Sequence, residues 1–155
     1  MKQKMRNHIF ACGQVIGFLT RYATLSQEAA EISLESVFMD YCLDCEHFEE
    51  YGIAVAIDQQ EHAVACALCE RYQLFVEGWN RGQSQAQQAF EMADLAVIEI
   101  IGTLAGWTTR RSPRTARSIT AEHDAAVGGF QGEVWQHFIT SWRQTGGDRR
   151  RIKGV

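Results

Sequence analysis

The chain has 155 residues, which is the length of one domain. Hydrophobic residues make up 46% of it and charged residues 22%, which excludes a disordered or fibrous protein. The single proline favours helices, because proline interrupts them. Five cysteines, an odd number, do not fit a secreted disulfide framework, so we expect a reducing, cytoplasmic location.

The net charge of −4 is distributed unevenly along the chain. Residues 1–25 carry four bases and no acid, residues 26–77 carry twelve acids and one base, and residues 78–155 carry ten bases and seven acids. An acidic block between basic ends either neutralises itself within the fold or presents an acidic surface to a partner. The sequence leaves both interpretations open.

Helical periodicity and capping residues predict an all-α fold, a compact five-helix bundle. The predicted helices cover about 7–22, 24–50, 58–78, 84–106 and 119–143. Glycines near residues 52 and 78 are interpreted as helix ends. We expect residues 1–145 to form one domain and residues 146–155 to form a mobile basic tail.

The fourth predicted helix, at about 84–106, is apolar on nearly every side. Its most apolar part, residues 95–107, is too short to span a bilayer and contains Glu99. A helix of this kind is expected to be largely buried among the others. Its apolar residues are Phe90, Met92, Leu95, Val97, Ile98, Ile100, Ile101 and Leu104.

Two Cys-x-x-Cys pairs, separated by twenty residues, are the most distinctive motif in the chain. If the second and third predicted helices form an antiparallel hairpin that turns near residue 55, the four thiols lie within about one turn of each other. Four thiolates at this spacing are candidate ligands for one structural zinc ion. These candidate metal ligands are Cys42, Cys45, Cys66 and Cys69.

The alternative is that these cysteines only pack as small apolar side chains. Neither "CLDC" nor "CALC" contains the glycine or proline that zinc knuckles usually carry. Redox catalysis is disfavoured, because catalytic pairs lie at a helix start whereas these lie mid-helix. The sequence leaves both zinc binding and packing open.

No motif of phosphate binding, serine hydrolysis or zinc proteolysis is present. His8, His47 and His137 are lone histidines with no surrounding pattern. His123 lies with two acids in a predicted first helical turn, where acids complement the helix dipole. We therefore expect a protein that is not an enzyme.

The second predicted helix has a main apolar stripe that includes Leu34 and is expected to face the core. It carries acids on the side away from this stripe, within about 100° of arc. Three apolar side chains lie in or beside that arc, and a purely solvated face does not need them. We name this set the acidic face; it consists of Glu28, Glu31, Ile32, Glu35, Met39, Leu43, Glu46, Glu49 and Glu50.

A mixed acidic and apolar surface is typical of a docking site for a basic protein partner. The alternative is that the first helix, with Lys2, Lys4, Arg6 and Arg21, covers the acidic face within the fold. The sequence favours a non-enzymatic protein-binding module with no membrane partner. One form that such a module takes is an inhibitor of nucleic-acid-handling machinery, which occupies the basic groove of its target.

A second, alternative function follows from the arginines near the C-terminal end. It is a zinc-stapled small regulator that contacts nucleic acid through a basic loop and tail. The net negative charge and the acidic block oppose direct contact with a duplex. We name this set the basic residues; it consists of Arg110, Arg111, Arg114, Arg117, Arg149, Arg150 and Arg151.

Overall fold

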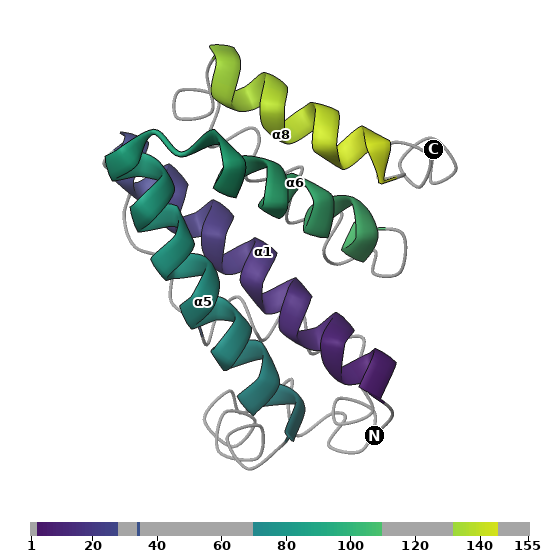
Figure 1. The fold of residues 1–155 in the computed structure, drawn as a ribbon. Coiled ribbons are helices and arrows are strands. Elements are labelled where there is room, and N and C mark those ends of the chain that lie inside the picture. The colour runs from purple at the N-terminus through teal and green to yellow at the C-terminus, as the bar shows by residue number, and fades with distance from the viewer. Residues whose placement is uncertain (1–2, 28–33, 35–69, 110–131, 146–155) are drawn as a thin grey trace, which may run out of the picture.

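The computed structural model describes residues 3–27, 34, 70–109 and 132–145. These residues form four helices and no strand, so the described part of the chain is all-α as predicted (Figure 1). The predicted count of five helices includes segments outside these residues. The helices are α1 (Gln3–Gln27), α5 (Glu70–Met92), α6 (Leu95–Thr109) and α8 (Gly132–Gln144).

Helix α5 runs without interruption through Gly78 and Ser84, so the predicted end and start at these positions are wrong. Gly78 and Gly82 are buried against α1, where the absence of a side chain lets the two backbones approach. The packing of this face holds α5 together despite the low helix propensity of glycine. These glycines therefore mark a helix contact and not a helix end.

The real interruption lies at Ala93 and Asp94, inside the fourth predicted helix. Ala93 has a positive φ of 50°, and the amide of Asp94 donates to the carbonyl of Ala89 at 3.2 Å. This bond is the six-residue closure of a Schellman helix end. The Asp94 carboxylate then accepts from the amide of Ala96 at 3.1 Å, which caps the start of α6. One residue thus ends α5 and the next begins α6.

Replacing Ala93 by glycine is expected to raise the free energy of unfolding by about 1 kcal/mol, because glycine adopts a positive φ without strain. Replacing Asp94 by alanine should lower it by about 1 kcal/mol through loss of the cap. Urea unfolding measures both changes.

The matched control is Ala96→Gly, which makes the same chemical change at an exposed helical position. This control should lower the free energy of unfolding by up to about 1 kcal/mol. Ala93→Gly and Ala96→Gly should therefore change the stability in opposite directions. Equal destabilisation by both would contradict the assigned backbone conformation at Ala93.

The prediction that residues 84–106 form one largely buried apolar helix is also wrong. Phe90 is 43% exposed, Met92 71% and Ile100 50%, whereas Ile98 and Ile101 are buried. The corner at Ala93 changes the direction of the chain, so only some apolar side chains of this segment, such as Ala89, Ile98 and Ile101, reach the common core. Part of the apolar surface counted as core therefore faces solvent.

Helix α1 extends to Gln27, beyond the predicted end near residue 22. Thr24 and Ser26, at the predicted start of the second helix, lie inside α1. The Thr24 hydroxyl donates to the carbonyl of Thr20 at 2.9 Å, a bond that hydroxyls make within helices. A second helix starting at residue 24 is therefore wrong. At the other end of the chain, α8 covers residues 132–144 of the predicted 119–143 segment, and residues 119–131 lie outside the described residues.

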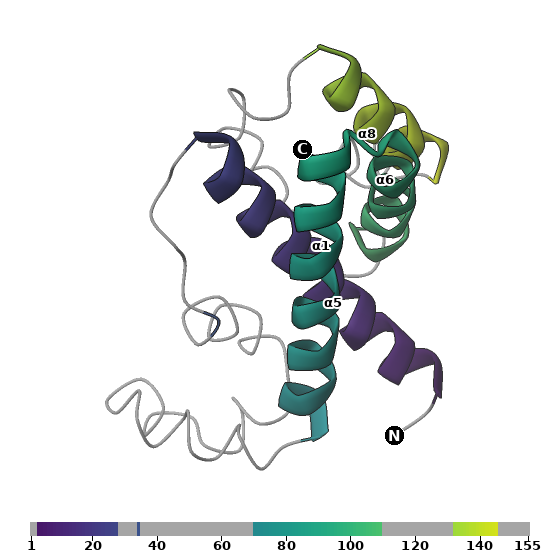
Figure 2. The ribbon, with the colours of Figure 1, turned by 60° about the vertical axis from the view of Figure 1, so that its left-hand side comes forward.

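The four helices form two parallel pairs, which the views in Figures 1 and 2 make visible. In the first pair, Arg6 contacts Glu70 and Arg21 contacts Gln87, so positions along α1 and α5 increase together. In the second pair, Glu99 of α6 contacts His137 of α8 near the start of both helices. Because a parallel pair cannot be joined by a tight turn, each pair requires a long connection.

Three pairs of glycines four residues apart lie where the helices of each pair meet: Gly13 and Gly17, Gly78 and Gly82, Gly102 and Gly106. A β-carbon at Gly17 would lie 2.6 Å from the carbonyl oxygen of Trp79, and one at Gly82 would lie 2.7 Å from the amide nitrogen of Phe18. Both distances are well inside van der Waals contact. The spacing puts both glycines of a pair on one helix face, so the backbones touch directly.

The buried side chains form two clusters, which take different residues of α1 and α5. We name the larger the main core; it joins α1, α5, α6 and α8 around Phe18, Ile98, Ile101, Phe138 and Trp142. We name the smaller the second core; it consists of Ile9, Cys12, Ile16, Phe75 and Trp79. Within the described ranges, no helix is both long and apolar enough to cross a membrane.

Candidate functional site

All site residues predicted from the sequence lie outside the described residues. The acidic face, the four cysteines and the basic residues fall within residues 28–33, 35–69, 110–131 and 146–155. The antiparallel hairpin expected to turn near residue 55 also falls there. These predictions remain predictions.

Beyond Gln27, Leu34 is the described residue of the second predicted helix. It is half-buried and packs against the second core. The sequence placed Leu34 in the apolar stripe of its helix, and its packing confirms that this side chain faces the core. The second core is thus the surface that Leu34 covers.

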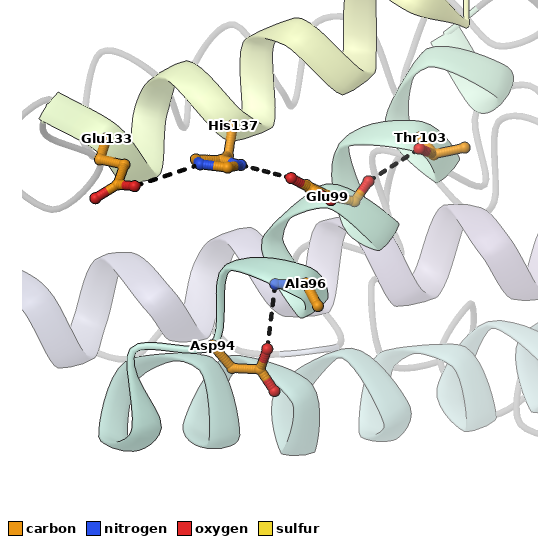
Figure 3. Close-up of polar contacts among 6 residues, drawn as sticks. All are labelled: Asp94, Ala96, Glu99, Thr103, Glu133 and His137. Atoms are coloured by element: carbon orange, nitrogen blue, oxygen red, sulfur yellow. Dashed lines mark hydrogen bonds and ion pairs between the residues drawn. The ribbon is translucent and has the colours of Figure 1, made fainter.

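The densest group of titratable side chains among the described residues joins α6 to α8 (Figure 3). The Nδ1 atom of His137 lies 2.6 Å from a carboxylate oxygen of Glu99, and its Nε2 atom lies 3.6 Å from a carboxylate oxygen of Glu133. Glu133 and His137 are one turn apart on α8, and Glu99 comes from the facing side of α6. The imidazole therefore lies between two carboxylates.

This group is suited to tying two helices together. Its two carboxylates meet opposite nitrogens of the ring, so in this arrangement they do not converge with the imidazole on one metal ion. Across residues 3–27, 34, 70–109 and 132–145, no set of three or more candidate ligands is arranged to hold a metal. Both glutamates are largely exposed, which screens their charges. The group supports packing of α6 on α8 more than it supports catalysis.

A double-mutant cycle of Glu99→Gln and His137→Gln should give a coupling free energy of about 0.5 kcal/mol, as exposed pairs do. The coupling should fall when the salt concentration rises. Urea unfolding of the four variants measures it. The matched cycle of Glu133→Gln with His137→Gln should give less coupling, since that distance is longer. Coupling above about 2 kcal/mol would contradict the role assigned to this group.

A second histidine, His8, lies against the buried thiol of Cys12. The Nε2 atom of His8 is 3.5 Å from the sulfur, and the ring meets Trp107 of α6 edge to face at 5.6 Å. Cys12 has no exposed surface, so its sulfur is not accessible as a nucleophile in this conformation. The one-turn spacing in "HIFAC" was the available signal for this contact, and the sequence interpretation missed it.

Buried amides form a further polar contact that the sequence did not reveal. Gln14 of α1 donates to the side-chain oxygen of Gln85 of α5 at 2.7 Å, close to the glycines at which α1 and α5 meet. Gln83 donates to the carbonyl of Gly17 at 2.8 Å. Nearby, burial raises the pKa of Tyr22 above its ordinary value. These groups fix the position of α1 on α5 and contain no arrangement typical of catalysis.

Comparison with protein-family models, with curated proteins and with solved structures gave no match to this chain. Functional inference for this protein therefore depends on its own residues and their arrangement.

Proposed function

We propose that this protein is a non-enzymatic helical module that binds another protein through the acidic face. The partner has a basic, partly apolar surface, such as the nucleic-acid groove of a nucleic-acid-handling protein, which the module blocks. The observation that supports this proposal is the packing of Leu34 against the second core.

Leu34 supports the proposal because it indicates which side of the second predicted helix faces the core. With Leu34 turned to the core, helical spacing puts the acids of the acidic face about 60–160° away around the axis. Ile32, Met39 and Leu43 fall about 140–180° away, which is the side opposite the core. Acidic and apolar side chains would then share the surface that a partner can reach.

The contacts of α1 also support an accessible acidic face. In the alternative interpretation, basic residues of the first helix cover that face. Instead, Arg6 forms an ion pair with Glu70 of α5. This contact holds the Arg6 side chain against α5.

Replacing Glu31, Glu35 and Glu46 together by lysine is expected to reduce partner capture at least about tenfold, because a basic partner then meets like charge. Capture is measured with tagged protein in extract of the native host, followed by titration of the captured protein. The far-ultraviolet circular dichroism should stay unchanged, since the three positions are predicted to face away from the core.

The matched control replaces Glu77 and Glu133, together with the exposed neutral residues Gln73 and Asn80, by lysine. It makes the same change in net charge elsewhere and should leave capture intact. Equal loss in both variants would show a general charge effect and would refute a specific face. The nucleic-acid alternative predicts that the unmodified protein binds a random DNA duplex. It also predicts that this binding is lost when Arg110, Arg111 and Arg114 are replaced by alanine.

A further inference from the structure

The corner where α5 turns into α6 exposes an unusual run of apolar surface. Four consecutive residues, Phe90 to Ala93, are exposed, and Ile100 is exposed on the second turn of α6. A corner between two helices normally buries side chains of this size against the rest of the fold. Exposed apolar groups close together are the usual mark of a contact surface.

The two most exposed of these side chains, Met92 and Ile100, belong to the two helices that meet at the corner. Gln88 donates to the carboxylate of Asp94 at 3.1 Å, so this side of α5 lies against the start of α6. Met92 follows Gln88 by one helical turn and therefore lies on that same side. On α6, exposed Ala96 and Ile100 are also one turn apart. Met92, Ala96 and Ile100 thus line one corner.

The charged residues within the corner's own segment of the chain are all acidic. Residues 82–109 contain Glu91, Asp94 and Glu99 and no lysine or arginine. Asp94 caps α6, and Glu99 contacts His137 (Figure 3), so the two carboxylates are held in place. A partner that covers Met92 and Ile100 therefore gains from positive charge at the edge of its apolar contact.

We infer that the α5–α6 corner, consisting of Met92, Ala96 and Ile100 with Glu91 and Glu99 beside them, is a second contact surface that takes a basic amphipathic helix of a partner protein. An amphipathic helix offers apolar residues one turn apart, which match Met92 and Ile100, and places lysine or arginine on the flanks of that stripe. This surface is separate from the acidic face in the sequence, and the inference does not depend on the proposed function.

The test uses a fluorescent synthetic peptide of leucine and lysine, about four helical turns long, with leucine at helical spacing. It is titrated by fluorescence anisotropy into full-length protein that also carries Glu31→Gln, Glu35→Gln and Glu46→Gln. That background weakens binding at the acidic face, so what remains reports on the corner. Adding Met92→Ser and Ile100→Ser should weaken binding roughly tenfold, as loss of central apolar contacts does.

Two controls separate the corner from general effects. Met5→Ser removes an apolar side chain that is 44% exposed on α1 and should leave binding unchanged. A peptide of the same composition with leucine out of helical register should bind roughly tenfold more weakly. Glu99→Gln should weaken binding less than the Met92→Ser, Ile100→Ser double variant does. The effect of Glu99→Gln should be larger at low salt, where charges are screened less.

Unchanged binding in the Met92→Ser, Ile100→Ser variant would overturn the inference, as would equal binding of the two peptides. Both outcomes would leave the proposed function standing, since its own test is capture by the acidic face. Conversely, intact capture in the Glu31, Glu35 and Glu46 lysine variant would refute the proposed function and leave the corner untouched.

Discussion

Replacing both Gly78 and Gly82 by alanine is expected to lower the free energy of unfolding by at least about 3 kcal/mol. The β-carbon at Gly78 would lie 2.9 Å from the carbonyl carbon of Phe10, and the one at Gly82 would lie 2.7 Å from the amide nitrogen of Phe18. Both obstacles are backbone atoms, so no side chain can rotate away and α1 and α5 must separate. Urea unfolding followed by circular dichroism measures the loss.

The direction of the stability change distinguishes a glycine that touches another backbone from a glycine at an exposed helix position. At an exposed position of a helix, exchange of glycine for alanine stabilises by up to about 1 kcal/mol. The control Asn80→Ala, on the exposed side of the same helix between the two glycines, should therefore be neutral or slightly stabilising. A stabilised Gly78→Ala, Gly82→Ala variant would show that the α1 and α5 backbones do not touch.

Replacing Phe75 by alanine is expected to lower the free energy of unfolding by about 3–5 kcal/mol. Phe75 has no exposed surface and stacks on Trp79 with ring centroids 6.5 Å apart. Its removal leaves a cavity in the second core, onto which Leu34 also packs. Thermal and urea unfolding measure the effect.

Phe90→Ala provides the matched control, since it deletes the same side chain from the same helix. Phe90 touches Tyr22 edge to face at 5.8 Å but is partly exposed, so its loss should cost about 1 kcal/mol. Similar costs for the two phenylalanines would contradict the burial of Phe75. Because Leu34 packs against the second core, Phe75→Ala should also weaken capture of a partner by the acidic face.

The two expected contact surfaces have different relations to the fold. The corner belongs to α5 and α6, and Asp94 and Ala93 determine its shape through backbone geometry. The proposed acidic face is instead related to the described structure through Leu34, which packs on the second core. Destabilising the second core should therefore affect the acidic face first and the corner less.

Several features of the chain could be predicted from local patterns. Apolar periodicity and the single proline predicted the helical fold, and the stripe containing Leu34 predicted that its side chain faces the core. These predictions work because a helix repeats every 3.6 residues whatever its neighbours are. Glycine was the residue that misled the interpretation, because Gly78 looks the same in sequence whether it ends a helix or meets another backbone.

The sequence by itself determined that this protein is helical, that its acids gather in one block, and that Leu34 belongs to a buried stripe. Only the tertiary structure decided that α5 passes through Gly78, that the helices form parallel pairs, and that Met92 and Ile100 face solvent at a corner. The physical reason is that periodicity describes one helix about its own axis. The closeness of two backbones and the burial of a side chain depend on the partner helix, which local sequence does not specify.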